Sequence, residues 1–216
     1  MVKRLTLRLS VLGDSKRRQL FIVIVSTIGI FGPWLMFELP VIHTIGHSTR
    51  TLSEFIELLR AEHIELLADI RTVPLSRTNP QFNFNTLPQA LAAKNIDYIQ
   101  LAKLGGLRKK SKTVAPDING FWINQSFHNY ADYALSEEFE QGLLRLQELC
   151  QDQRCAIMCS EAVWWRCHRR IVADYLLYRG RMVVHLIGRG RAEPATLTAA
   201  ATPLGNSLLY PAPVVG

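Results

Sequence analysis

The feature that most constrains the fold is a regular alternation of short apolar runs and amphipathic stretches from residue 41 onward. The apolar runs have the length and the bounding glycine and polar residues of buried strands, and the stretches between them place apolar side chains at helical spacing. We predict strands at residues 41–46, 64–70, 96–101, 154–159 and 181–187. Strands that alternate with helices form mainly parallel sheets covered on both faces. The sequence therefore predicts an α/β fold with a mainly parallel sheet of about five strands and helices on both faces.

The amphipathic stretches carry signals for where helices begin. Thr51 with Glu54, and Thr86 with Gln89, have the spacing of a capping box. Further along we predict two helices and one long loop, the helices from Tyr130 and over residues 165–178, and the loop over residues 107–125. Long loops in compact domains are commonly functional.

The first forty residues differ from the rest of the chain. Basic side chains precede an uncharged, mostly apolar run at residues 20–37, which has the minimum length of a membrane span. Three interpretations of the extension are open. It is a membrane anchor with its N-terminus inside, or a short hydrophobic hairpin against the domain, or it is not part of the native protein because Met36 is the true start. We divide the chain into this basic and then hydrophobic extension (1–40), an α/β domain (41–190) and a tail that completes the domain (191–216).

Charge and cysteine content limit the classes of function. The net charge of +7 owes more to the extension than to the body, because residues 41–216 hold 19 basic and 16 acidic side chains. That balance does not by itself predict a polyanion partner. The four cysteines form no CxxC pair, which favours free thiols in a reducing compartment. We expect a cytoplasmic protein, or one anchored in the inner membrane through residues 20–37, the only segment expected to meet a membrane.

Polar and reactive side chains follow the predicted strands at the point where each strand ends. In open parallel sheets, ligands bind beyond the carboxyl ends of the strands. In chain order this edge receives His47, Ser48, Asp69, Arg71, Arg77, Gly105, Gly106, Cys159 and Glu161. We therefore predict a ligand site at this edge of the sheet.

Four short stretches in this order and at these separations carry a family resemblance. They are IGHSTR (45–50), DIRTVPLSRTNPQFN (69–83), LGG (104–106) and CSEAVWWRCHR (159–169). Over about residues 41–210 the chain resembles the bacterial domain of unknown function 488 family. The resemblance implies an α/β fold with a site at the IGHS stretch, the D-x-R loop and the C-x-E and CHR residues, and it implies no reaction.

Cys159 is the candidate nucleophile. At the end of a strand and before a helix, a thiol is close to the positive helix terminus and here to Arg166 and Arg169, which favours the thiolate. Simple burial of a small apolar residue is the competing interpretation. Arg166 follows Cys159 one residue later than the arginine of a cysteine phosphatase, and the intervening loop is bulky, so the spacing disfavours that class.

The remaining candidates are acid–base and anion-binding groups. His47, Glu161 and His168 are the candidate general acids or bases. A helix N-terminus and clustered arginines bind phosphate or carboxylate, and the candidate substrate-binding residues are Ser48, Asp69, Arg71, Arg77, Arg166 and Arg169. Helix capping by Ser48 and pairing of Asp69 with Arg71 are the structural alternatives.

A metal site is the weaker interpretation of the same residues. Its alternative ligands are Cys159, Cys167 and His47. The spacing of the two cysteines matches no zinc finger or ribbon. Adjacent residues of a helix point in different directions, so Cys167 and His168 are not expected to bind one ion. We predict no metal and leave the cofactor open.

These residues favour an enzyme, a hydrolase or transferase that acts on a small anionic or nucleotide-like substrate at the carboxyl ends of the strands. Glu161 and the histidines would move protons, and Cys159 would be the nucleophile. The alternative is a module that binds nucleic acid or a phosphorylated ligand without catalysis. In that case Lys109, Lys110 and Lys112 would add to the arginines. The oligomeric state stays open.

Overall fold

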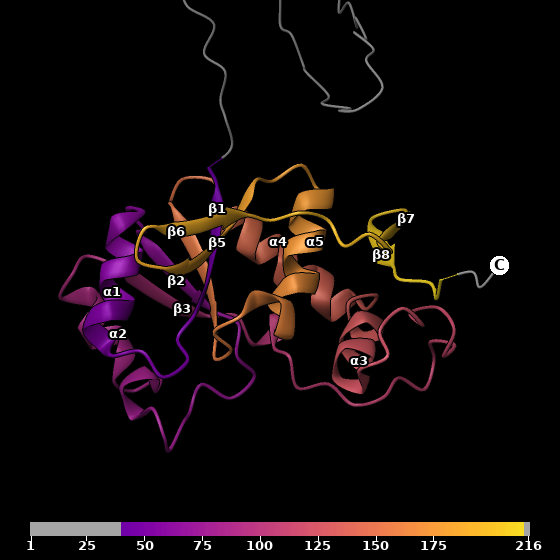
Figure 1. Ribbon diagram of the computed structural model, residues 1–216, viewed down its shortest axis with the longest axis horizontal. Helices are drawn as coiled ribbons and strands as arrows, with labels where there is room; N and C mark the ends of the chain where they lie inside the picture. Colours follow the sequence, from indigo (N-terminus) through magenta and orange to yellow (C-terminus); the bar gives the residue numbers. More distant parts are fainter. Residues whose placement is uncertain (1–39, 214–216) are drawn as a thin grey trace, which may run out of the picture. The chain divides into compact units, whose positions relative to one another are not determined.

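The computed structural model describes residues 40–213 (Figure 1). The predictions for the N-terminal extension, including the membrane anchor at residues 20–37 and the start at Met36, lie outside the described residues. Within the described part of the chain, no helix has both the length and the apolar character needed to cross a membrane.

Six strands form one sheet in the order β3-β2-β4-β1-β5-β6. Their bounds are β1 Ile42–Gly46, β2 Leu66–Asp69, β3 Asp97–Gln100, β4 Cys155–Cys159, β5 Val183–Gly188 and β6 Arg191–Pro194. Neighbouring strands from β3 to β5 run parallel, and β6 runs antiparallel to β5. The predicted mainly parallel sheet is confirmed, and the tail supplies a sixth strand that the sequence did not predict.

β4 shows why these apolar runs fold as central strands. Cys155, Ile157 and Cys159 belong to the core on one face of the sheet, and Ala156 and Met158 belong to the core on the other. A strand that is covered on both faces needs apolar residues at every position.

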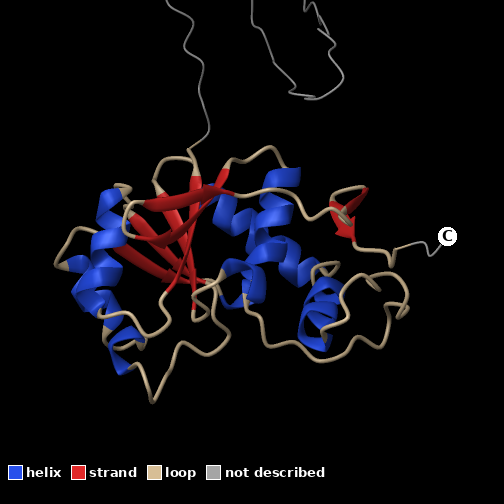
Figure 2. Cartoon of the chain, viewed as in Figure 1, coloured by secondary structure: helices blue, strands red, loops and turns tan. Residues whose placement is uncertain are grey.

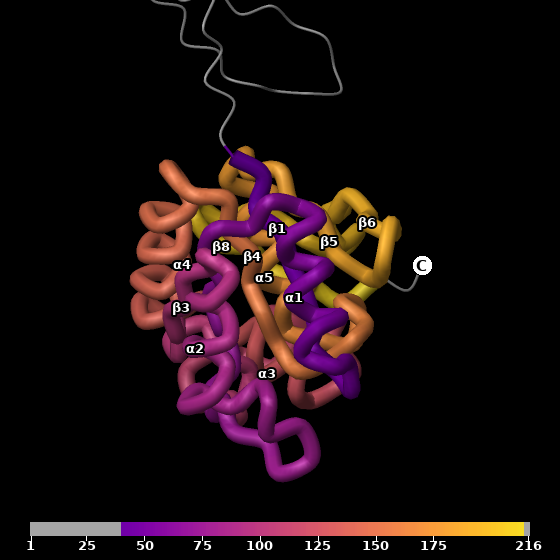
Figure 3. The backbone as a smooth tube through the Cα atoms, turned by 90° about the vertical axis from the view of Figure 1, so that its left-hand side faces the viewer, coloured from indigo at the N-terminus to yellow at the C-terminus, as the bar shows by residue number. Residues whose placement is uncertain are grey.

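Helices cover both faces of the sheet, as predicted (Figure 2). On one face lie α1 (Leu52–Ala61) and α2 (Leu87–Ala92), which face the viewer in Figure 3. On the other face lie α3 (Gln125–Tyr133), α4 (Glu137–Leu149) and α5 (Arg169–Tyr178). The shorter elements are the 3-10 turns η1 (Pro80–Phe82), η2 (Ala102–Leu104) and η3 (Trp164–Arg166) and the tail hairpin of β7 (Thr202–Leu204) and β8 (Ser207–Leu209).

One of the two predicted capping boxes forms. The Glu54 amide donates to the Thr51 hydroxyl at 3.2 Å, and the Thr51 amide donates to the Glu54 carboxylate at 2.9 Å. The prediction for Thr86 is wrong, because its backbone is already helical and its hydroxyl donates to the side chain of Asn85.

The helix predicted over residues 165–178 begins later than expected. Trp164–Arg166 form η3, Cys167 has extended backbone (φ −126°, ψ 146°), and α5 begins at Arg169. Cys167 and His168 therefore precede the regular helix. The rule that adjacent helical residues point apart does not apply to them.

Candidate functional site

An open cavity of about 700 Å³ lies at the carboxyl ends of β1, β2 and β4. This volume is in the range of small-molecule sites. Among its lining residues are His47, Ser48, Arg71, Gly106, Cys159, Glu161, Arg166, Cys167 and His168. The fold thus brings residues from four separate segments of the chain to the sheet edge at which the sequence places a site.

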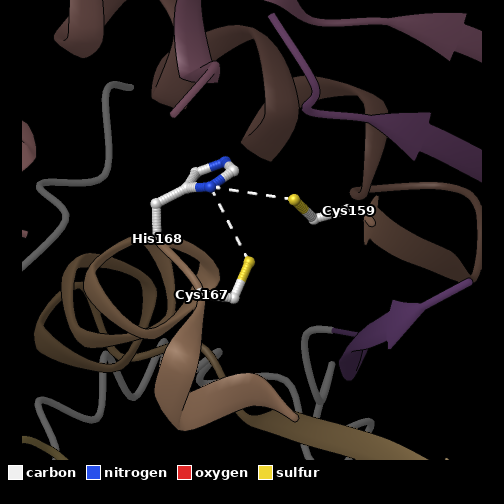
Figure 4. A group of neighbouring side chains, drawn as sticks. All are labelled: Cys159, Cys167 and His168. Carbon is white, nitrogen blue, oxygen red and sulfur yellow. Dashed lines mark hydrogen bonds between the residues drawn. The ribbon is translucent and has the colours of Figure 1, made fainter. Parts of the chain in front are cut away.

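Cys159, Cys167 and His168 lie together on the wall of this cavity (Figure 4). Nδ1 of His168 lies 3.8 Å from Sγ of Cys159 and 3.7 Å from Sγ of Cys167. These three atoms all lie within 4.8 Å of one another. The expectation that Cys167 and His168 point apart is wrong, because it assumed regular helix at both residues, whereas both precede α5 and their donor atoms converge.

A backbone carbonyl determines which ring nitrogen of His168 carries a hydrogen. Its Nε2 lies 3.1 Å from the carbonyl oxygen of Ile70. A carbonyl oxygen can only accept, so Nε2 carries a hydrogen and the Nδ1 of the neutral ring offers a lone pair to the thiols. The ring also packs against Tyr130, with 4.9 Å between ring centroids. His168 is therefore held in the orientation of a proton acceptor for Cys159.

Cys159 is the more acidic of the two thiols. Hydrogen bonding from the Cys167 thiol, together with His168 and the charge of Arg169, holds the pKa of Cys159 well below its ordinary value despite burial. Burial and the hydrogen bond to Cys159 raise the pKa of Cys167 well above its ordinary value. Of the two thiols, Cys159 therefore ionises more readily, and Cys167 is the thiol that donates to it.

Arg71 is fixed at the cavity wall by Asp69. Its Nε lies 2.9 and 3.1 Å from the two carboxylate oxygens of Asp69, and its Nη2 donates to the carbonyl of Phe82 at 2.7 Å. Burial opposes the charge of Arg71, but the hydrogen bonds and charge of Asp69 outweigh burial and raise the pKa of Arg71. Asp69 itself is fully buried, so it orients the arginine and does not line the cavity.

Both ring nitrogens of His47 are engaged. Its Nδ1 lies 2.9 Å from the carbonyl oxygen of Ser48 and donates to it, and its Nε2 accepts from Nη1 of Arg71 at 3.3 Å. The ring stacks on Phe82, and burial lowers the pKa of His47. Both nitrogens of His47 are therefore hydrogen-bonded to protein groups, and the ring helps to position Arg71. The acid–base role of His47 stays a prediction.

Two of the predicted anion-binding arginines do not face the cavity. Arg169 is buried and donates to two carbonyl oxygens, that of Ile45 at 2.6 Å and that of Glu161 at 2.9 Å. It ties the loop after β4 to the end of β1, which is why it cannot reach a ligand. Arg77 is exposed and is not among the residues that line the cavity. Arg166 and Glu161 are exposed and do line it.

Two glycines are required by close contacts at the site. A Cβ atom on Gly106 would lie 2.4 Å from Nδ1 of His168, and one on Gly46 would lie 1.8 Å from the carbonyl oxygen of Glu161. In the sequence, the LGG stretch is part of the family resemblance, but no physical role for its glycines was predicted. Glycine is the default residue where another group approaches the backbone closely, and the pair Gly105–Gly106 at the site edge is the signal that could have identified Gly106.

Comparison with known proteins gives one match. A family model described as "Domain of unknown function DUF488" matches residues 51–176, more than half of the chain. No curated protein and no solved structure matches the chain. The matched residues include β2, β4 and the CHR stretch that form the cavity. The chain therefore belongs to the domain of unknown function DUF488 family.

Proposed function

We propose that this protein is a hydrolase or transferase that forms a covalent intermediate on Cys159 with a small anionic substrate. The observation that carries the proposal is the pairing of Cys159 Sγ with Nδ1 of His168 on the wall of an open cavity. A nucleophile next to a base that a third group orients is the arrangement that activates cysteine for covalent catalysis. Here the third group is the carbonyl of Ile70.

We assign acyl transfer to this cysteine–histidine pair. His168 accepts the Cys159 proton at Nδ1, and the thiolate attacks the acyl carbon of an ester or thioester. A carbon–sulfur bond forms, the bond to the leaving group breaks, and His168 returns its proton to the leaving atom. Water, or a second acceptor nucleophile, then attacks the acyl-cysteine and releases the thiol. No external oxidant or reductant is needed.

The preference for an anionic substrate rests on Arg166 and Arg71. Within residues 40–213, no carboxylate lies at ion-pair distance from Arg166, which is exposed at the cavity. Arg71 is neutralised by Asp69 but still presents a cavity-lining guanidinium in a fixed orientation. A partly enclosed site strengthens the attraction of such groups for an anion. A free thiol nucleophile also requires a reducing compartment, and the cytoplasm is the one we propose.

The proposal is tested with a chromogenic ester pair. The anionic ester is 4-acetoxy-3-nitrobenzoate and the neutral ester is 2-nitrophenyl acetate. We expect acetylation of Cys159, detected by mass spectrometry, and release of the nitrophenol. The Cys159→Ala variant should lose both signals, and Arg166→Gln should slow the anionic ester more than the neutral one. Equal rates for the wild type and Cys159→Ala, after correction for spontaneous hydrolysis, would refute the proposed mechanism.

The alternative of nucleic-acid binding rests on a different surface. Lys109, Lys110 and Lys112 are exposed, but none of them lines the cavity that holds Cys159. Two results together would favour that alternative. A fluorescent single-stranded oligonucleotide would bind with an affinity that falls steeply as the salt concentration rises, and replacement of these lysines by glutamine would make that fall less steep.

A further inference from the structure

The donor atoms of Cys159, Cys167 and His168 have the spacing of metal ligands. In a tetrahedral zinc site, Zn–S bonds of ~2.3 Å and Zn–N bonds of ~2.0 Å separate sulfur from nitrogen by about 3.6 Å and the two sulfurs by about 3.8 Å. The two sulfur-to-nitrogen distances here are 3.8 and 3.7 Å, and the three atoms lie within 4.8 Å of one another. One ion can therefore reach all three atoms after small side-chain movements.

The surroundings of His168 support this interpretation independently. Histidines that bind metals almost always donate their other ring N–H to a carbonyl or carboxylate, which fixes the ring and its tautomer. His168 does this through Nε2, which lies 3.1 Å from the carbonyl oxygen of Ile70. On the Nδ1 side, the missing Cβ of Gly106 leaves the space that any other residue would fill.

We propose that Sγ of Cys159, Sγ of Cys167 and Nδ1 of His168 bind one thiophilic divalent ion, Zn²⁺ by preference. Two sulfur ligands and an imidazole select zinc over the hard cations magnesium and calcium. All three residues line the open cavity, so a fourth ligand, water or a substrate atom, reaches the ion from that side. Three protein ligands with one open position are the pattern of zinc sites that are not purely structural.

Metal binding and the proposed nucleophile share one sulfur atom. When Cys159 is a ligand, one lone pair of its sulfur is bound to the metal, and the positive ion withdraws charge from the others, so the sulfur is a weaker nucleophile toward an ester. Bound zinc therefore slows acyl transfer. This inhibitory part rests on the proposed function, whereas the binding itself does not.

Cobalt is the probe for binding. Metal-free protein, treated with chelator and then dialysed, is titrated with Co²⁺, and Zn²⁺ is added afterwards. We expect one Co²⁺ per chain, intense visible bands of a tetrahedral ion, a sulfur-to-cobalt charge-transfer band, and loss of all these bands on addition of Zn²⁺. Weak bands of octahedral Co²⁺ with no charge-transfer band would overturn the proposal, and this result does not depend on any variant.

Substitutions then assign the ligands. Cys167→Ala and His168→Gln should each weaken zinc binding by more than the roughly 10–100-fold that loss of an outer-shell partner costs. Cys150→Ala is the matched control, because Cys150 is a buried free thiol near another thiol, that of Cys155, but does not line the cavity. Equal loss in the control would overturn the assignment. Thermal melting of each variant shows whether it is folded.

The two proposals fail in different ways. Zinc binding by a protein that shows no acyl transfer even when metal-free would refute the proposed function and leave the metal site supported. Acyl transfer that is unaffected by a saturating equivalent of Zn²⁺ would overturn the inhibitory part, and the cobalt titration alone decides the binding.

Discussion

Sγ of Cys159 and Nδ1 of His168 lie 3.8 Å apart across the junction between β4 and α5. β4 ends at Cys159, and His168 is the residue directly before the first turn of α5. The opposite side of the ring is held by Ile70, which follows β2. The pair is therefore positioned by two adjacent parallel strands, and small changes in the packing around the ring should alter its reactivity.

Gly106→Ala tests whether space at the His168 ring matters. The added Cβ would lie 2.4 Å from Nδ1, so the ring must move away from the thiols or the loop must shift. Overpacking of this kind costs about 1–3 kcal/mol, and we expect Cys159 alkylation to slow by about tenfold. The readouts are urea denaturation and alkylation rate. Gly188→Ala is the control, because an added Cβ there meets no atom within 4 Å. An unchanged alkylation rate in Gly106→Ala would mean that the ring position is unimportant.

Asp69→Asn tests how strongly the Asp69–Arg71 pair is needed. Both side chains are buried, and removal of one partner of a buried ion pair leaves an uncompensated charge, at a cost of about 3 kcal/mol in the free energy of unfolding. Arg145→Gln breaks the exposed pair with Glu148 and should cost less than about 1 kcal/mol. Chemical denaturation of both variants gives the comparison. Similar decreases in the free energy of unfolding of the two variants would show that the buried pair stabilises the fold no more than the exposed pair does.

Acid should destabilise the fold through His185. Burial, with the charge of Arg169, lowers the pKa of His185 from 6.5 to about 4. Below pH 6.5 the unfolded chain binds a proton that the folded chain does not, so stability falls as the pH falls from 6.5 to 4, by up to ~3 kcal/mol. Above pH 6.5 both states are neutral, and this residue adds no pH dependence.

The His185 contribution is isolated by substitution. His185→Asn retains a polar group toward the hydroxyl of Thr44, which lies 2.8 Å from Nδ1. This variant should lose part of the acid sensitivity measured by denaturation at pH 7, 5.5 and 4.5, whereas His63→Asn at the surface should retain it. If the free energy of unfolding of His185→Asn falls with pH as steeply as that of the wild type, the acid sensitivity comes from other groups.

Local pattern was enough to predict the sheet and the edge that carries the site. The apolar runs predicted the five parallel strands. The residues that follow the strand ends predicted that His47, Arg71 and Cys159 lie together at one edge of the sheet. β6 was missed because it depends on a tight turn at Gly190, whose φ of 65° lets the chain reverse and pair with β5. Glycine flanked by two arginines in the low-complexity tail did not stand out as a hairpin signal.

The finer arrangement of the site depends on contacts that are distant in sequence. Arg169 is buried because Ile45, more than one hundred positions away, presents a carbonyl oxygen to it. The shared orientation of Cys167 and His168 depends on where α5 begins, and helix boundaries are the part of a pattern that is read least accurately. A shift of four residues in the start of the helix, from 165 to Arg169, changed two adjacent side chains from divergent to convergent.

The most direct test of the central claim compares the alkylation of Cys159 by iodoacetate, an anion, and by iodoacetamide, which is neutral, in metal-free protein. The ratio of the two rate constants should exceed the ratio for glutathione, and Arg166→Gln should lower it by at least about threefold, because a charged cleft concentrates anions. Cys150 and Cys155 are fully buried and should not react, and Arg145→Gln is the charge-matched control. A ratio that equals that of glutathione, or one that Arg166→Gln leaves unchanged, would contradict an anion-binding site built around a reactive Cys159.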